Sequence, residues 1–464
     1  MAADWPALQA AIDGEVVLSG SAAYELARKP FFARFHDSHP EAVVFCSSAS
    51  DVVEVLRFAV RSGVRPRSRS GGHCFAGRSA GDGIVIDVSP IRSVEVADGY
   101  ARIGAGARLG ELYEALGRAG VTIPGGSCPS VGIAGLTLGG GLGILGRMFG
   151  LTSDSLESAE IVLADGQIVE CDARHHADLF WALRGGGAGS FGVVTRLQLR
   201  TRPTLPATNF RLSWSHQHAA RLIQAWQQWA PVAPDEVYAT LLVSAAGAPD
   251  RSFAVELVGS DFGSESDATR RLDEFIARSG ADPSSQVRRH ASFRDTTRFW
   301  AGLDATSEAN LNADPQALQS AHVYVKSEFF RQPLPSEAIA SLLANFATPH
   351  AAGEERELDF TPWGGGYNRV AADATAFAHR AELFSLKHTL AIDPNGSSAA
   401  EDSARRWLEH SWLSVRPWGS GRVFPNFPDP ALDDPGRAYY AGNYERLLRV
   451  KKRYDPDDVF PPVA

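Results

Sequence analysis

Three glycine-rich clusters lie between residues 68 and 193, and they restrict the possible folds of this chain more than any other feature. They read SRSGGHCFAG (68–77), PGGSCPSVGIAGLTLGGGLG (124–143) and RGGGAGSFGV (184–193). Glycine allows the backbone to approach a ligand closely and to point successive amide groups at phosphate oxygens. The clusters therefore predict three loops that share one large phosphate-bearing cofactor. The alternative is that they are only tight turns between packed strands.

The second cluster runs into Gly141-x-Gly143-x-x-Gly146, which matches the spacing of a dinucleotide-binding fingerprint. That fingerprint needs a buried strand immediately before it and a helix that begins inside it. The preceding residues are themselves glycine-rich and contain no uninterrupted apolar run, so we do not expect a nicotinamide site. A P-loop is excluded because no Gly-Lys-Ser or Gly-Lys-Thr occurs in the chain.

The segments around the clusters predict an α+β fold class. Residues 48–63 have apolar side chains at helical spacing, and hairpins are predicted about Asp98-Gly99 and Asp165-Gly166. Beyond Pro203 the glycine clusters cease, and helices alternate with strands in a second α+β unit. We expect domains at 1–204 and 205–418, followed by a C-terminal segment at 419–464. This segment predicts a helix that ends at Asp455-Pro456, with a short strand after it.

Composition narrows the class of partner. The 464 residues carry a net charge of −9, and no run of Lys or Arg suggests a surface for nucleic acid or an anionic membrane. No signal peptide is evident at the N-terminus, and no window holds eighteen consecutive apolar residues. We therefore expect a cytoplasmic protein whose partners are small molecules. The four cysteines are too few and too scattered for a disulfide framework or a zinc site, and we expect no metal.

Two nucleophilic side chains stand inside the glycine clusters. His73 follows Gly71 and Gly72, and Cys128 follows Gly126 and Ser127. Two such groups on glycine loops favour covalent capture of a cofactor. A Cys/His protease would need an orienting Asn or Asp, and it would leave the three clusters without a purpose.

Together with NYERLLRVKKRYDPDDVF (443–460), the clusters resemble the berberine-bridge-enzyme-like flavoprotein oxidases of the vanillyl-alcohol-oxidase superfamily. The resemblance covers nearly the whole chain in order. It implies a PCMH-type FAD-binding domain and a substrate domain of antiparallel sheet backed by helices, which roofs the flavin ring. It also implies that the C-terminal helix and strand return to the FAD-binding domain.

The resemblance implies bicovalent FAD, with His73 as the 8α-linked histidine and Cys128 bonded to flavin C6. Val131 stands where the family gates oxygen, and its small side chain resembles that of the oxidases. Molecular oxygen is therefore the expected electron acceptor, with H₂O₂ as its product. The family gives Cys74 no role. The other residues expected to contact the cofactor are Arg69, Ser70, Gly71, Gly72, Gly132, Gly135, Gly140, Val194 and Asn426.

The chain departs from the family at the catalytic base. Hydride transfer from a substrate needs a group that removes the O–H or N–H proton. The two positions where this family often has tyrosine hold Phe75 and Phe424. Lys387 is our first candidate for the base, and His388 or Tyr367 is the second. Because Lys387 and His388 are neighbours on a predicted strand, at most one of them faces the flavin.

These features predict an FAD-dependent oxidase that acts on a secondary alcohol, a hemiacetal or a C–H group of a natural product from secondary metabolism. The two missing phenols keep a second redox reaction open, namely oxidative cyclisation or desaturation. A non-redox cyclase that uses flavin as a scaffold is a rival from another class. An FAD-binding protein without turnover is a further one.

Overall fold

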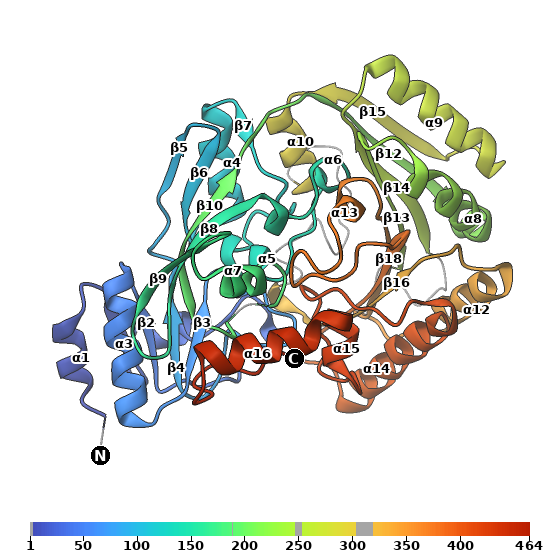
Figure 1. Ribbon diagram of the computed structural model, residues 1–464. Helices are drawn as coiled ribbons and strands as arrows, with labels where there is room; N and C mark the ends of the chain where they lie inside the picture. The colour runs from blue at the N-terminus through green and yellow to red at the C-terminus, as the bar shows by residue number, and fades with distance from the viewer. Residues whose placement is uncertain (1–2, 188, 246–252, 303–318) are drawn as a thin grey trace.

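The computed structural model describes residues 3–187, 189–245, 253–302 and 319–464. Two groups of sheets, one from each half of the chain, face each other, and the C-terminal helices lie beneath both (Figure 1). Ala188, within the third glycine cluster, lies outside the described residues.

The N-terminal half begins with a small mixed sheet in the order β1-β2-β4-β3. Its strands are β1 (Glu15–Leu18), β2 (Ala42–Phe45), β4 (Ile84–Asp87) and β3 (Pro66–Arg69). β4 pairs in parallel with β2 and β3, because α3 (Ala49–Ser62) crosses over between β2 and β3. Ser48 caps α3 by accepting from the Asp51 amide, and Gly63 ends it in the left-handed conformation.

An antiparallel sheet in the order β5-β6-β10-β8-β9 packs against this small sheet. Its strands are β5 (Val94–Ala97), β6 (Tyr100–Gly104), β10 (Val193–Arg200), β8 (Leu156–Val162) and β9 (Ile168–Asp172). The predicted turns at Asp98-Gly99 and Asp165-Gly166 join β5 to β6 and β8 to β9. The remaining elements of this half are α1 (Trp5–Ala11), α2 (Tyr24–Ala27), α4 (Leu109–Arg118), β7 (Val121–Thr122), α5 (Ile133–Leu138), α6 (Gly146–Phe149), α7 (Ala177–Leu183) and β11 (Arg202–Pro203).

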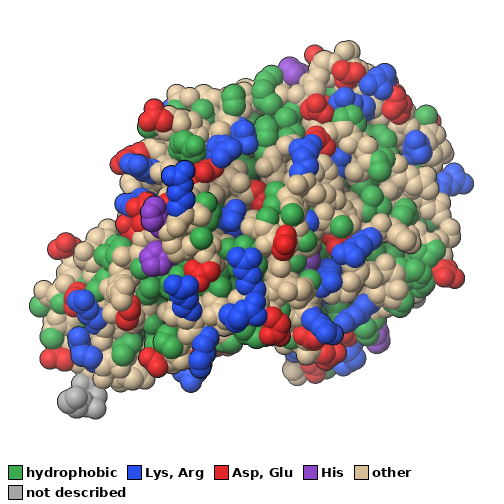
Figure 2. Space-filling model, viewed as in Figure 1, with side chains coloured by type: hydrophobic (Ala, Val, Ile, Leu, Met, Phe, Trp, Pro, Cys, Tyr) green, Lys and Arg blue, Asp and Glu red, His purple; other side chains and the backbone are tan. Residues whose placement is uncertain are grey.

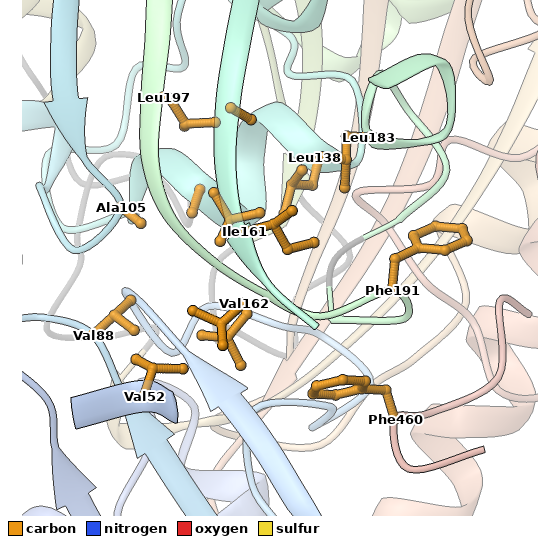
Figure 3. Close-up of a cluster of buried hydrophobic side chains, with 14 of the residues drawn as sticks. Val52, Val88, Ala105, Leu138, Ile161, Val162, Leu183, Phe191, Leu197 and Phe460 are labelled. Atoms are coloured by element: carbon orange, nitrogen blue, oxygen red, sulfur yellow. The ribbon is translucent and has the colours of Figure 1, made fainter. Parts of the chain in front are cut away.

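The core between these two sheets is apolar and closely packed. Figure 3 shows Val52 and Val88 on one side of it and Ile161, Val162 and Leu197 on the other. Each of these side chains is almost completely buried. The core supports the three glycine clusters, which follow β3, β7 and α7.

The second half forms one antiparallel sheet, whose seven described strands run in the order β15-β12-β14-β13-β17-β18-β16. They are β15 (Ser285–Ala291), β12 (Ala207–Ser215), β14 (Ala254–Asp261), β13 (Val237–Ala245), β17 (Glu355–Pro362), β18 (Phe384–Ile392) and β16 (His322–Phe330). One face packs on α8 (Ala219–Trp229), α9 (Glu265–Ser279), α12 (Ser336–Phe346) and α14 (Ser398–Leu413). The other face turns toward the glycine clusters, with α10 (Phe293–Trp300) at its side.

The C-terminal segment returns to the first half, as the resemblance implies. After α13 (Gly366–Arg369) and α14, the chain forms α15 (Pro435–Tyr440) and α16 (Tyr444–Tyr454), and α16 contacts α7 (Figure 1). Lys451 donates to the Ser190 carbonyl at 2.9 Å. The strand predicted at the end is wrong, because Val459 and Phe460 pair with no strand in the described part of the chain, and the Phe460 side chain packs into the N-terminal core (Figure 3).

Charged side chains of both signs are interspersed on the face shown in Figure 2. None of the helices in the described ranges is both long enough and apolar enough to span a bilayer.

Candidate active site

A cavity of about 390 Å³ lies between the glycine clusters and the open face of the seven-stranded sheet. Both halves of the chain contribute to it, so the fold brings distant motifs together. The predicted site residues that line it are Arg69, Ser70, Gly71, Gly72, His73, Cys128, Val131, Gly132, Gly135, Val194, Lys387 and Asn426. Gly140 does not line the cavity; at a φ of 117° it lies beside Phe377, whose ring would be 3.1 Å from an added Cβ.

The first two glycine clusters touch backbone to backbone. A Cβ on Gly71 would lie 2.3 Å from the Gly132 nitrogen, so neither position has room for a side chain. Ser70 donates from Oγ to the Ala105 carbonyl at 2.7 Å and ties the loop to the sheet below. The two loops thus form one wall, which carries both His73 and Cys128.

Arg69 offers the cavity only its backbone. Its guanidinium is turned inward, where Nε lies 2.6 Å from Asp87 Oδ2 and Nη2 donates to the Ala27 carbonyl at 2.5 Å. Both members of this ion pair are buried and also accept or donate further hydrogen bonds, which is the condition under which a buried pair is tolerated. The side chain therefore holds β3 and the start of the loop in place.

His73 is kept as a neutral imidazole. Burial lowers its pKa to about 3, and the nearby charge of Arg108 acts in the same direction. Its Nε2 atom is buried and has no hydrogen-bond partner among the described residues. A neutral imidazole has an unprotonated ring nitrogen, which is the form able to act as a nucleophile.

Cys128 is a free, partly exposed thiol at the second cluster. Its Sγ lies 3.4 Å from Ser130 Oγ, and its carbonyl accepts from the Val131 amide at 3.3 Å. Cys46 and Cys171 are instead buried in the core, where burial raises the pKa of both thiols. The two partly exposed thiols, Cys128 and Cys74, are therefore the ones that line the cavity.

Asn426 fixes the second glycine cluster from the C-terminal segment. Its Oδ1 accepts from the Gly141 amide at 3.0 Å, and its Nδ2 donates to the Gly135 carbonyl at 3.1 Å. These two bonds span α5 and join parts of the chain that are 285 and 291 residues apart.

Arg78 and Ser79 also line the cavity and were missed by the sequence reasoning. Within the described ranges the Arg78 side chain makes no hydrogen bond or ion pair, and the buried Ser79 Oγ has no partner. An unpaired guanidinium beside an unpaired hydroxyl suits a negatively charged ligand such as a phosphate. In the sequence, the one signal that could have pointed to them is that they follow His73 by five and six residues. The cavity wall therefore fits a phosphate-bearing cofactor.

The opposite wall comes from the seven-stranded sheet and from α10, and Lys387 on β18 is part of it. Lys387 Nζ lies 3.3 Å from Asp359 Oδ2 and 3.7 Å from Glu357 Oε1. The same atom is 5.6 Å from the centre of the Phe427 ring. The other residues of this wall are Arg211, Tyr238, Thr240, Leu242, Val258, Phe299, Trp300, Asp359 and Thr361.

Asp359 is the carboxylate beside Lys387 and was missed by the sequence reasoning. Strand pairing sets it directly opposite Lys387, in the register of β17 and β18. Asp359 Oδ1 accepts from Thr240 Oγ1 at 2.5 Å and from Thr361 Oγ1 at 3.0 Å. No motif marks Asp359; only the pairing of two strands reveals it.

His388 does not reach the cavity, which corrects its place among the candidate bases. As strand alternation requires, it points to the opposite face of β18 from Lys387. There its Nδ1 lies 2.8 Å from Ser411 Oγ on α14. Burial and the charge of Lys326 lower the pKa of His388 to about 3, so it is a neutral core residue.

Tyr367 is also outside the cavity, and its place as a candidate base is corrected too. Its side chain is fully buried and stacks on Trp363 with ring centres 4.2 Å apart. The hydroxyl donates to the Gly143 carbonyl at 2.9 Å. Burial raises its pKa. The phenol therefore supports the glycine cluster from behind.

Phe75 and Phe424 both line the cavity where the family often has tyrosine. Phe424 packs among Phe329, Trp363 and Phe377 in an aromatic cluster. The cavity thus has a phenyl group at each of these positions, and Asp359 with Lys387 forms an ion pair on the facing wall.

Comparison with known proteins agrees with this architecture. The family model described as FAD binding domain matches residues 40–172, and the one described as berberine and berberine like matches residues 423–461. The FAD-linked oxidoreductase YgaK of Bacillus subtilis (strain 168), described as uncharacterized, is 31% identical over 432 residues, which are 91% of this chain and 90% of the relative.

Solved structures agree over almost the whole chain. A variant of BBE-like 1 from Physcomitrella patens has a TM-score of 0.89 at 27% identity and covers 99% of this chain and 98% of its own. Glucooligosaccharide oxidase from Acremonium strictum has a TM-score of 0.87 at 26% identity, with coverage of 99% and 98%. That protein is described as holding 6-S-cysteinyl, 8α-N1-histidyl FAD.

The fold and the cavity are those of an FAD-linked oxidoreductase. The chain belongs to the berberine bridge enzyme-like family of these flavoproteins. The predicted family, fold class and enzyme class are confirmed.

Proposed function

We propose that this protein is an oxidase that holds FAD through bonds to both His73 and Cys128 and passes electrons from a small-molecule substrate to O₂, with release of H₂O₂. The observation that carries the proposal is that both nucleophiles line one wall of the same cavity, on two loops in backbone contact. The doubly linked FAD of the Acremonium strictum oxidase supports it. Bound FAD would supply the ring that accepts hydride from a substrate C–H bond.

Different residues of the chain would hold different parts of the FAD. His73 and Cys128 would fix the ring, the amides of residues 69–72 would face the pyrophosphate, and Arg78 would neutralise part of its charge. Two attachments would retain the cofactor in an open pocket, and they would make the ring a stronger oxidant. This proposal leaves the facing wall free to bind a bulky substrate.

We propose that Asp359, with Lys387 beside it, accepts the proton that the substrate loses. An ionised carboxylate has about four acceptor sites, and the contacts of Asp359 with Thr240, Thr361 and Lys387 use three of them. The remaining site would accept a substrate O–H proton. Lys387 lies beside two carboxylates, and its ammonium group would offset their negative charge. It would act as a hydrogen-bond donor that polarises the substrate oxygen, rather than as the base.

The substrate class that fits this wall is a secondary alcohol or a hemiacetal, such as the reducing end of a sugar. Thr240, Thr361 and Asp359 would bind its hydroxyl groups, and Trp300 would offer an apolar face to its ring. The sugar oxidation that names the Acremonium strictum relative supports this assignment. Oxidative cyclisation is the second candidate, favoured by the phenyl groups of Phe75 and Phe424 where the family often has phenols.

Anaerobic addition of glucose, glucooligosaccharides and secondary alcohols to the purified protein tests the redox proposal. Bleaching of the flavin absorbance, with recovery and H₂O₂ release on admission of air, is the expected result. An absorbance that stays unchanged while a substrate is consumed would instead identify a non-redox cyclase.

Val131 provides a prediction for the oxygen step. Its side chain lines the cavity three residues after Cys128, and we propose that its small size leaves O₂ a path to the ring. Replacement of Val131 by Leu adds a methylene to this path and should slow reoxidation by about tenfold, which corresponds to roughly 1.4 kcal/mol on the barrier. Stopped-flow mixing of the reduced protein with O₂ measures this rate. Equal rates for parent and variant would remove Val131 from the oxygen path.

A further inference from the structure

The His73 ring is held by an aromatic stack from an upstream segment. Phe31 lies almost parallel to the imidazole, with ring centres 3.7 Å apart and an interplanar angle of 23°. Phe32 approaches the same imidazole edge-on at 5.9 Å. Both phenylalanines precede the region matched by the FAD-binding family model.

The backbone locks this segment to the glycine loop. The Phe31 amide donates to the Gly72 carbonyl at 3.2 Å. Gly72 has a φ of 74°, and a Cβ there would stand 3.2 Å from the Phe31 nitrogen and 3.4 Å from the Pro30 Cα. Only glycine adopts this conformation readily and leaves room for so close an approach. The stack is therefore a fixed part of the fold.

Packing and a hydrogen bond to the Ser130 backbone together set the orientation of the imidazole. Its Nε2 atom has no hydrogen-bond partner among the described residues, so no bond to that atom holds the ring. A histidine side chain can otherwise turn about two torsions, and the second of these is broad. The face of the Phe31 ring restricts both torsions by contact.

We propose that Phe31 is a positioning residue for the attachment of FAD to His73, an inference that rests on the proposed function. The stacked ring presents the imidazole to the cofactor in one orientation. In the attachment, an imidazole N–H bond and a C–H bond of the flavin 8α-methyl group break, and an N–C bond forms. The two electrons and two hydrogens reduce the flavin, and O₂ takes both to give H₂O₂ and the oxidised, linked cofactor.

Phe31 can be exchanged with little risk to the core. It is only partly buried, whereas Phe32 is buried with Val323, Val325 and Ala391 of the seven-stranded sheet. Phe35 provides a matched control in the same segment. Its ring packs on the same loop at Gly77, where an added Cβ would lie 2.6 Å from it.

The experiment uses the Cys128→Ala protein, in which His73 is the only proposed attachment. Into it are introduced Phe31→Ala, Phe31→Leu, Phe31→Tyr and, as the control, Phe35→Leu. Each purified protein is incubated with FAD in air, and samples are taken over time. Acid precipitation removes free FAD, and intact-mass measurement then gives the fraction of protein with linked FAD. Thermal unfolding shows that each variant is folded, and Phe31→Leu keeps most of the packing volume if Phe31→Ala does not fold.

We expect Phe31→Leu and Phe31→Ala to slow attachment by roughly a hundredfold, which is the cost of a small misplacement of a reacting group. Phe31→Tyr, which keeps the aromatic face, and Phe35→Leu should attach FAD at the rate of the Cys128→Ala parent. Attachment at the parent rate in Phe31→Leu would overturn the inference and leave the proposed function standing. A Cys128→Ala parent with no acid-stable flavin would overturn both.

Discussion

At the residue scale, Lys387 and His388 are neighbours on one strand but have different environments, one in the cavity and the other in the core. Lys387 lines the cavity, whereas His388 contacts Ser411 among the helices on the other face. Alternation predicted that only one of them could face the cofactor. Which face is which depends on the neighbouring elements, and the sequence alone does not provide that.

The residues that sequence reasoning missed share a physical cause. Asp359 meets Lys387 through the register of two strands, and Phe31 meets His73 across 42 positions of chain without a motif. The glycine clusters and both nucleophiles could be recognised because their neighbours in sequence define them. Contacts formed only by tertiary packing leave no local pattern to recognise.

Asp359→Asn tests the proposed proton acceptor. The amide keeps the shape of the carboxylate but cannot take a proton, so flavin reduction should slow by about 10²- to 10⁴-fold. Anaerobic stopped-flow absorbance with a substrate found in the screen measures this rate, and Lys387→Ala is measured beside it. As a control, the amount of FAD bound per protein in both variants must equal that in the parent. A rate near the parent's in Asp359→Asn, with a large loss in Lys387→Ala, would return the role of base to Lys387.

At the scale of elements, the second glycine cluster is a loop supported from two distant segments. Asn426 bonds to Gly135 and Gly141, while Tyr367 bonds to Gly143. The resemblance placed Tyr367 among the candidate bases because it lies in a loop that matches one of the family. The structure instead shows this hydroxyl buried behind the loop.

Tyr367→Phe separates these two roles. Loss of this buried hydrogen bond should lower the free energy of unfolding by about 0.5–1.5 kcal/mol, because the Gly143 carbonyl keeps only its bond from the Gly146 amide. The rate of flavin reduction should stay within a few-fold of the parent. Chemical denaturation and stopped-flow absorbance measure the two quantities. A hundredfold slower reduction at unchanged stability would show that the hydroxyl takes part in the reaction.

The loop that leads to Phe424 and Asn426 has a pH-sensitive anchor. Glu328 on β16 accepts through Oε1 from the amides of Gly421 at 2.6 Å and Arg422 at 3.2 Å. Burial raises the pKa of Glu328 to about 7 from 4.5. The folded protein therefore keeps this proton at pH values where the unfolded chain has lost it.

It follows that Glu328 makes stability fall as the pH rises from about 4.5 to 7. At about 1.4 kcal/mol per pH unit, the loss reaches roughly 3 kcal/mol. Glu328→Gln keeps the acceptor oxygen and removes the charge, so it should flatten this part of the profile and be the more stable protein at pH 8. Thermal unfolding between pH 4.5 and 8 measures this. Parallel profiles for parent and variant would show that Glu328 does not titrate in this range.

At the scale of the whole molecule, the cavity exists only because two sheets from different halves of the chain face each other. The sequence predicted both halves, their order and the return of the C-terminal helix. It predicted Lys387 but not its partner Asp359 on the facing wall, because that wall is built from strands whose order in the sheet differs from their order in the chain. The cofactor side was therefore foreseen more completely than the substrate side.

The central claim is that one FAD is bonded to both His73 and Cys128. Acid precipitation followed by intact-mass measurement tests it on the parent protein, His73→Ala, Cys128→Ala and the double variant. The account predicts a yellow pellet and the added mass of one FAD in the parent and in each single variant, and a colourless, unmodified double variant. A colourless pellet and an unmodified mass for the parent would contradict it.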